Sequence, residues 1–197
     1  MHKLVTVILS SAVAMAALTG CSEDQTAGKD AVAVGGTFSF VSPGGQTVIT
    51  YPEEERQPVQ SFSGESLMED GKTVSLDDYA GKVVVLNAWG QWCGPCRSEV
   101  DDLEAIHEEL GDEGTVLGIN VRDPQKDAAR DFVVDNGVTY PSIYDPPFRT
   151  AAALGGIPAT VIPTTIVLDK QQHRPAAVFL TEVTVDDLRP IIEELVS

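Results

Sequence analysis

Two cysteines separated by two residues are the part of this sequence whose spacing most directly indicates chemistry. Cys93 and Cys96 stand in the run Trp-Cys-Gly-Pro-Cys, behind the apolar run 83–86 and ahead of a helical pattern. At this spacing the two sulfurs can close a disulfide across the first turn of a helix. The helix N-terminus also favours a thiolate, because its free N–H groups and its dipole attract negative charge. The pattern therefore predicts a redox-active dithiol.

Other uses of a cysteine pair fit this chain less well. Three cysteines in 197 residues are too few for a disulfide-stapled scaffold. A purely structural disulfide across two residues would restrain the unfolded chain very little. A zinc site would need two further ligands, and the sequence shows no second Cys-x-x-Cys and no His pair. We therefore expect no metal, and no cofactor other than a redox-active disulfide between Cys93 and Cys96.

The third cysteine, Cys21, follows a stretch typical of a secretory signal. Residues 1–20 combine the basic Lys3 with an apolar stretch and small residues. The run Leu-Thr-Gly-Cys that ends at Cys21 resembles the bacterial lipobox, which implies cleavage before this cysteine and its acylation. An ordinary signal peptide with an incidental cysteine is the alternative. We expect a lipoprotein signal peptide over 1–20, a flexible tether over 21–36, and a lipid anchor at Cys21 on the extracytoplasmic face of the cell membrane.

The charge of the chain excludes some classes of partner. Thirty Asp and Glu residues against thirteen Lys and Arg give a formal net charge of −17. Nucleic acids and anionic membrane surfaces recruit basic proteins. We expect no nucleic-acid partner, and we expect the contact with the membrane to depend on the lipid anchor.

The pattern after the tether predicts an α/β domain. Residues 37–41 and 47–51 flank a Pro/Gly-rich turn, which predicts a β-hairpin within an N-terminal extension over 37–58. Strand and helix patterns then alternate through 59–197, and a terminal hairpin and helix close the chain. The expected strands cover 62–67, 73–76, 82–88, 115–121, 140–144, 164–168 and 176–180, and the expected helices begin at Pro95, Asp123 and Val183. The expected architecture is a central mixed β-sheet flanked by helices.

One segment also carries a resemblance to a known family. Residues 82–99, Lys-Val-Val-Val-Leu-Asn-Ala-Trp-Gly-Gln-Trp-Cys-Gly-Pro-Cys-Arg-Ser-Glu, resemble the active-site segment of thioredoxin-fold oxidoreductases. The likeness is strongest to the ResA/TlpA-like membrane-tethered branch and extends over residues 60–197. The whole design is similar to actinobacterial thioredoxin-like lipoproteins associated with cytochrome c maturation. The resemblance implies a thioredoxin-like sandwich.

The cysteines take different roles in this interpretation. Cys93, at the helix start, is expected to attack and form a mixed disulfide with the substrate, and Cys96, one turn later and more buried, to resolve it. Trp92 is expected to cover the rim of the site and to contact substrate together with Gly94 and Pro95.

The resemblance also places three further side chains beside the dithiol. Pro163 matches the family's cis-proline, although Pro158 is a competing candidate, and a cis bond there would present Ile162 and Thr164 to an incoming peptide. Glu99 occupies an acidic position near the dithiol and could exchange protons with it, or could be an ordinary solvated carboxylate. Asn87 stands where thioredoxin has a buried aspartate, which makes Glu99 the expected substitute.

These features predict an extracytoplasmic thiol–disulfide oxidoreductase. In the favoured version it reduces the haem-binding disulfide of apocytochrome c, with electrons from a membrane thiol reductase. A general disulfide oxidase or isomerase for exported cysteine-containing proteins would use the same residues, although the Gly-Pro dipeptide favours reduction. A copper-carrying lipoprotein is the alternative of another class, but His107 and His173 stand in no recognisable motif. A peroxidase is weaker still, because no proline–threonine–cysteine motif appears.

Overall fold

A computed structural model describes residues 36–171 and 173–197 of the chain. The predicted signal peptide, the predicted lipidation site Cys21 and the predicted tether up to residue 35 lie outside the described residues. Within the described part, no helix is both long and apolar enough to cross a membrane.

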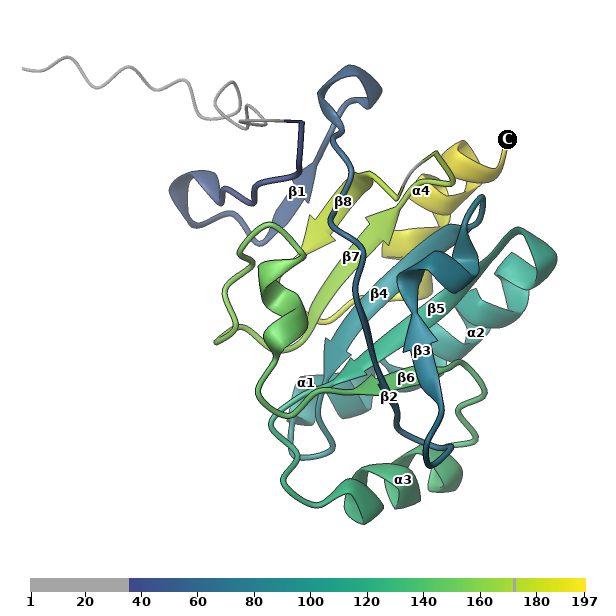
Figure 1. The fold of residues 1–197 in the computed structure, drawn as a ribbon. Coiled ribbons are helices and arrows are strands. Elements are labelled where there is room, and N and C mark those ends of the chain that lie inside the picture. The colour runs from purple at the N-terminus through teal and green to yellow at the C-terminus, as the bar shows by residue number, and fades with distance from the viewer. Residues whose placement is uncertain (1–35, 172) are drawn as a thin grey trace, which may run out of the picture.

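In residues 36–171 and 173–197, eight strands form one sheet in the order β1-β8-β7-β4-β5-β6-β2-β3 (Figure 1). The strands are β1 Val48–Thr50, β2 Ser63–Ser66, β3 Thr73–Ser75, β4 Val83–Trp89, β5 Gly114–Asn120, β6 Ser142–Tyr144, β7 Thr164–Leu168 and β8 Pro175–Phe179. The central strands β4, β5 and β6 are parallel, and every other pairing is antiparallel. The mixed sheet predicted from the sequence is confirmed. β4 and β5 are buried along their whole length, as expected for strands covered on both faces.

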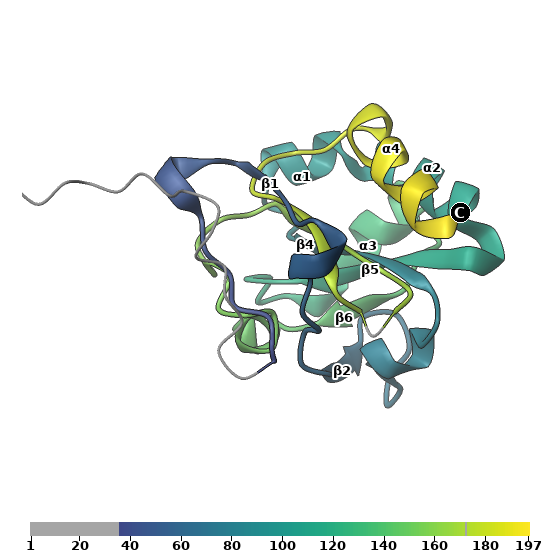
Figure 2. The same ribbon diagram turned by 90° about the horizontal axis from the view of Figure 1, so that it is seen from above.

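Within the described part of the chain, four α-helices lie on one face of this sheet. They are α1 Gly94–Ser98, α2 Val100–Leu110, α3 Lys126–Asp135 and α4 Val185–Val196. Alternate residues of β4 face opposite sides, so Val83 and Val85 pack in one core cluster with α2 and α4. Val84 and Leu86 belong to a second cluster, which includes the segments that precede β2 and β7. Figure 2 shows α2 and α4 together on one side of the sheet.

The predicted N-terminal hairpin is wrong. Residues 37–41 form no strand, and β1 pairs instead with β8, where Ile49 lies opposite Val178. Phe38 donates its backbone N–H to Pro58 at 2.9 Å. The physical reason is burial, because Phe38 and Ile49 belong to the main core and bury more apolar surface there than a two-stranded hairpin could.

The helices depart from the sequence pattern at two places beside the dithiol. The single helix expected from Pro95 is divided at Glu99, whose φ of −88° and ψ of −6° separate α1 from α2. The helix expected to begin at Asp123 begins at Lys126. The carboxylate of Asp123 makes its hydrogen bonds elsewhere, as described below.

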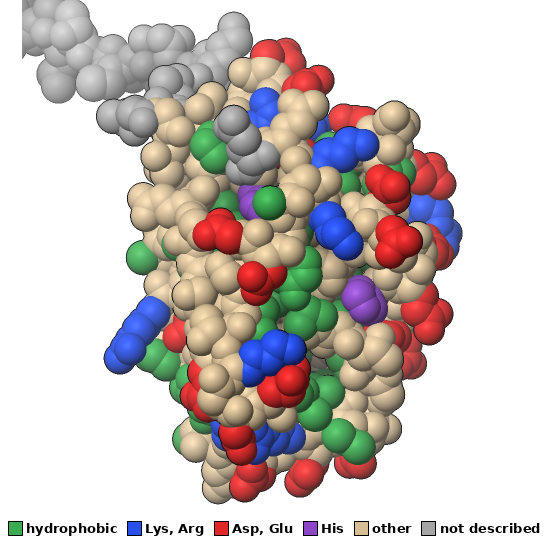
Figure 3. All heavy atoms as spheres, turned by 45° about the vertical axis from the view of Figure 1, so that its right-hand side comes forward, with side chains coloured by type: hydrophobic (Ala, Val, Ile, Leu, Met, Phe, Trp, Pro, Cys, Tyr) green, Lys and Arg blue, Asp and Glu red, His purple; other side chains and the backbone are tan. Residues whose placement is uncertain are grey.

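Acidic side chains outnumber basic ones among the described residues. Figure 3 shows Asp and Glu side chains over much of one face, with several Lys and Arg side chains among them. Many of the cations are neutralised locally, such as Lys126, whose Nζ lies 2.6 Å from Oε1 of Glu65.

Candidate active site

The two cysteines form a disulfide where β4 passes into α1. Cys93 is the N-terminal cap of α1, and its Sγ accepts a hydrogen bond from the backbone N–H of Cys96 at 3.2 Å. Pro95 lies in the first helical turn, where a missing N–H is tolerated. The sequence predicted this placement correctly. The greater burial predicted for Cys96 is wrong, because both cysteines are 4% exposed and pack in the same apolar cluster.

Trp92 lies at the rim of the dithiol and is 44% exposed. Its indole Nε1 donates to the carbonyl of Val121 at 3.1 Å, which holds the ring against the loop after β5. Gly90 makes this position possible, because a Cβ at that residue would lie 2.3 Å from Nε1 of Trp92. Gly94 and Pro95 are also exposed, so the three predicted substrate contacts at the start of α1 are accessible.

The carboxylate of Asp123 binds the same loop. The sequence interpretation did not identify this role of Asp123. Its Oδ2 accepts the backbone N–H of Gln91 at 3.0 Å and the side-chain amide of Asn120 at 2.7 Å. Asp followed by Pro is a common helix start, so the local pattern favoured a capping role. The observed contact joins residues far apart in the sequence, and a local pattern carries no signal for it.

The peptide bond between Ile162 and Pro163 is cis, as predicted, and Pro158 is not the cis residue. In the register of β7 with β4, Thr164 lies opposite Ala88, so Pro163 stands at the end of β4 that leads to the dithiol. Ile162 packs against the cluster that contains both cysteines. Thr164 is 2% exposed and its hydroxyl donates to the carbonyl of Val161 at 2.9 Å, so its side chain is not available to a substrate.

Glu99 is buried, with an exposed fraction of 1%. Oε1 accepts from Nδ2 of Asn87 at 2.8 Å, and Oε2 accepts from the backbone N–H of Val183 at 3.0 Å. Glu99 therefore joins the α1–α2 boundary to β4 and to the segment before α4. It is not the solvated carboxylate that the sequence left open as an alternative.

Burial raises the pKa of Glu99 to about 7 from an ordinary value of 4.5. The hydrogen bonds from Asn87 and Val183 act in the opposite direction, and the nearby negative charges of Glu182 and Asp102 raise the pKa further. A carboxyl group with such a pKa can give or take a proton near neutral pH. Glu99 and Cys96 are three residues apart on a helical backbone, a spacing that places side chains on the same face.

The two histidines considered for copper lie in other contacts. Nδ1 of His107 is 3.4 Å from Oγ1 of Thr115, and Nε2 of His173 is 3.0 Å from the carbonyl of Tyr79. Residues 36–171 and 173–197 contain no cluster of three or more side chains suited to hold a metal ion.

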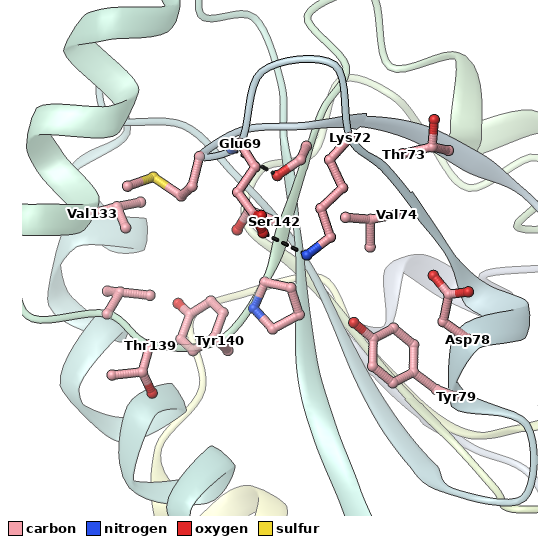
Figure 4. A pocket seen from close by; sticks show the side chains of 14 residues that line it. Glu69, Lys72, Thr73, Val74, Asp78, Tyr79, Val133, Thr139, Tyr140 and Ser142 are labelled. Atoms are coloured by element: carbon pink, nitrogen blue, oxygen red, sulfur yellow. Dashed lines mark hydrogen bonds and ion pairs between the residues drawn. The ribbon is translucent and has the colours of Figure 1, made fainter.

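A cavity of about 360 Å³ opens between the β2–β3 hairpin and the segment that enters β6 (Figure 4). Nζ of Lys72 and Oε1 of Glu69 face each other there at 2.6 Å. The lining includes Tyr79, Tyr140 and Ser142. It includes neither cysteine and none of the site residues predicted from the sequence.

The disulfide and its surroundings can transfer two electrons to or from the cysteines of another polypeptide. Cys93 follows an exposed aromatic rim, and Cys96 lies on the same helical backbone as a carboxyl group that titrates near neutrality. This fold and this site define a thioredoxin-like thiol–disulfide oxidoreductase.

The chain belongs to the AhpC/TSA family, which matches residues 56–173. A curated relative, the thiol-disulfide oxidoreductase ResA of Geobacillus kaustophilus, is 33% identical over 133 residues, which cover 64% of this chain and 73% of the relative. The resemblance to the ResA-like branch is thereby confirmed.

Two solved structures are similar over almost their whole length. A DsbF homologue from Corynebacterium diphtheriae is 68% identical, with a TM-score of 0.78, and the match covers 81% of this chain and 100% of that one. A secreted thiol-disulfide isomerase from Corynebacterium glutamicum is 63% identical, with a TM-score of 0.79, and the match covers 82% of this chain and 99% of that one. Both support the thioredoxin-like fold and the class of activity.

Proposed function

We propose that this protein exchanges thiols and disulfides in exported proteins outside the cytoplasm. The observation that carries the proposal is the Cys93–Cys96 disulfide at the start of α1, beside the exposed ring of Trp92. The signal-like residues 1–20 and the relative described as a secreted isomerase support the compartment.

The exchange takes two steps. In the reduced protein the Cys93 thiolate attacks one sulfur of a substrate disulfide, which forms a mixed disulfide and releases the other substrate sulfur as a thiolate. The Cys96 thiolate then attacks Sγ of Cys93, closes the internal disulfide and releases the second substrate sulfur. The substrate gains two electrons and two protons, and the protein loses them. Reversal of both steps oxidises a substrate dithiol.

Glu99 supplies the proton transfer that the second step needs. Cys96 must lose its proton before it can attack, and a buried carboxylate on the same helical backbone can accept it. Because the pKa of Glu99 is near 7, the carboxyl can also return the proton in the reverse direction. Asn87 acts as a positioning residue, since its amide fixes one carboxylate oxygen at 2.8 Å.

Two directions of electron flow use these residues. Reduction of the apocytochrome c disulfide, with electrons from a membrane thiol reductase, is favoured by the Gly-Pro dipeptide between the cysteines. Isomerisation or oxidation in a wider set of exported proteins is favoured by the name of the Corynebacterium glutamicum relative. A reduction potential near that of thioredoxin, about −270 mV, would support the first, and one between protein disulfide isomerase, about −180 mV, and DsbA, about −120 mV, would support the second.

Trapping with Cys96→Ala identifies the substrate directly. Without the resolving thiol, the mixed disulfide on Cys93 persists and can be recovered from cells under non-reducing conditions. Apocytochrome c in the trapped fraction would support the reductase, whereas many unrelated secreted proteins would support the isomerase or oxidase. Cys93→Ala is the matched control and should trap nothing. Equal trapping by both variants would overturn the proposed order of attack.

We also propose that Cys21 anchors the protein to the membrane. Two acyl chains give stable attachment, whereas one chain is marginal. In the native host the full chain should fractionate with membranes, and Cys21→Ser should appear in the soluble or secreted fraction. Membrane attachment that persists in the Cys21→Ser variant would contradict the lipid anchor.

A further inference from the structure

Two arginines beside the dithiol carry charges that no carboxylate neutralises within the described residues. Arg97 follows Cys96 in α1, and Arg122 lies between β5 and α3, and neither has a carboxylate oxygen within ion-pair distance in residues 36–171 and 173–197. The next cation, Lys126 of α3, does pair with Glu65. Both arginine side chains are exposed, and both contact the active-site loop, Arg97 through the carbonyl of Gln91 and Arg122 through the ring of Trp92.

Arg97 is held without being neutralised. Its Cζ lies 5.2 Å from the centre of the Phe132 ring, and its Nη1 donates to the carbonyl of Gln91 at 3.4 Å. An aromatic face and a neutral carbonyl orient a guanidinium and leave its full positive charge in place. The remaining N–H donors of Arg97 are therefore available to a carboxylate.

Arg122 is also held by an aromatic ring and a neutral carbonyl. Its Cζ lies 5.8 Å from the centre of the Trp92 ring, and its Nη2 donates to the carbonyl of Ala159. The residue adopts a φ of 56°, in the left-handed region that side-chain-bearing residues seldom occupy. Its backbone N–H donates to the carbonyl of Pro146 at 2.9 Å, which fixes this conformation. Backbone conformations of this kind cluster at functional sites.

The turn that carries Arg122 is also the turn that supports the active-site loop. The residue before Arg122 accepts the indole N–H of Trp92, and the residue after it accepts the backbone N–H of Gln91. The position of Arg122 is therefore fixed relative to the residues that lead into Cys93. Figure 1 shows α1 and the loop that enters α3 at the same end of the sheet.

We propose that Arg97 and Arg122 form an anion-recognising rim, which selects polypeptide substrates with Asp or Glu next to the exchanging cysteine. This inference rests on the proposed thiol–disulfide exchange. A guanidinium pairs with a carboxylate through two parallel N–H bonds, so an oriented arginine favours Asp or Glu over neutral side chains. The formal net charge of the protein is −17, which disfavours an acidic peptide, so the preference comes from these two side chains and not from the net charge.

The test uses three peptides that differ only in the residue after their single cysteine, which is Asp, Asn or Lys. Each peptide is supplied as a mixed disulfide with 2-mercaptoethanol, and the reduced protein converts it to the two free thiols. We expect the Asp peptide to react about fivefold faster than the Asn peptide at low salt, and the Lys peptide about fivefold slower. The differences should shrink at about 0.5 M NaCl, because salt screens exposed charges.

Substitutions of the two arginines test whether they cause the preference for the Asp peptide. Arg122→Gln should reduce the Asp/Asn rate ratio at least twofold, and Arg122→Glu should invert it. Arg97→Gln should also reduce the Asp/Asn rate ratio. It tests the rim independently of Arg122, in case the loop does not fold without the Arg122 side chain. Lys82→Gln is the matched control, because Lys82 also has no ion pair within the described residues and stands at the opposite end of β4, about 20 Å away. It should leave the ratio unchanged.

The outcomes separate the two proposals. The rate with the neutral Asn peptide depends on the dithiol and not on the two arginines. If the Asn peptide did not react, the proposed thiol–disulfide exchange would be overturned. Equal rates for the three peptides with the wild-type protein would overturn the rim and leave the exchange intact. A change in the ratio as large in Lys82→Gln as in Arg122→Gln would also overturn the rim, because net charge would then explain the preference.

Discussion

Asn87 and Glu99 form a buried pair at the centre of the site, in which the Asn87 amide donates to Oε1 of Glu99 at 2.8 Å. The same amide nitrogen lies 3.0 Å from Oγ1 of Thr165 on β7. This contact ties the helical backbone that carries the dithiol to the two central strands behind it. Since burial raises the pKa of Glu99 while the bond from Asn87 lowers it, the pair sets the pH at which the carboxyl exchanges protons.

Glu99→Gln should remove a specific pH dependence of stability. The pKa of Glu99 is raised from 4.5 in the unfolded chain to about 7 in the fold, so the folded state binds the extra proton between these values. Its contribution is therefore fully present below pH 4.5 and is lost as pH rises to 7, by about 3 kcal/mol in total. Urea unfolding of the oxidised protein from pH 4 to 8 measures this change in the free energy of unfolding.

The control for this experiment is Glu108→Gln, an exposed carboxylate on α2. The wild-type curve and the Glu108→Gln curve should fall together with rising pH, and the Glu99→Gln curve should lack that decrease. An unchanged slope in Glu99→Gln would mean that this carboxyl titrates at its ordinary value.

Asn87→Asp should destabilise the oxidised protein at pH 8 by about 3 kcal/mol, because two buried carboxylates would then face each other at hydrogen-bond distance. Glu99→Gln should suppress most of this loss, since a neutral amide can donate to the new carboxylate. A double-mutant cycle from urea unfolding at pH 8 measures the coupling, which we expect at about 2 kcal/mol. Additive effects of the two substitutions would show that the pair does not interact energetically.

Gly90→Ala should displace Trp92. The new Cβ would lie 2.3 Å from Nε1 of Trp92, so the ring must move and the indole must lose its bond to the carbonyl of Val121. We expect a loss of about 2 kcal/mol in the free energy of unfolding and a shift of tryptophan fluorescence. At Gly94 a Cβ would meet no atom within 4 Å, so Gly94→Ala should leave the fluorescence unchanged. Identical spectra for the two variants would contradict the packing of Trp92 on the loop.

Much of the site could be predicted from the sequence, because its main parts are local. The buried strand β4, the dithiol at the helix start and the strand after Pro163 each leave a pattern within a few consecutive residues. The acidic residue three positions after Cys96 could be assigned to the site in the same way. Its burial could not, since that depends on Asn87 and Val183, which approach from other parts of the chain.

The parts that could not be predicted depend on contacts between distant segments. Asp123 has the sequence context of a helix cap, but its carboxylate serves the loop at Gln91, which lies 32 residues earlier. Arg122 has no local signal for a left-handed backbone. The Pro/Gly-rich turn after Val41 suggested a hairpin, but β1 pairs with β8, near the other end of the sequence. Contacts between distant segments outweighed the local preference in each case.

The N-terminal segment should therefore contribute to the stability of the whole domain. Ile49 and Val48 are neighbours on β1, but Ile49 is buried in the main core and Val48 is 47% exposed. Because Ile49→Ala leaves a cavity, it should cost about 3 kcal/mol in the free energy of unfolding, whereas Val48→Ala should cost less than about 0.5 kcal/mol. Both should unfold in one transition when followed by circular dichroism and by tryptophan fluorescence. If Ile49→Ala produced a separate early transition that left tryptophan fluorescence unchanged, residues 37–58 would be an independent extension, and β1 would add nothing to the stability of the active site.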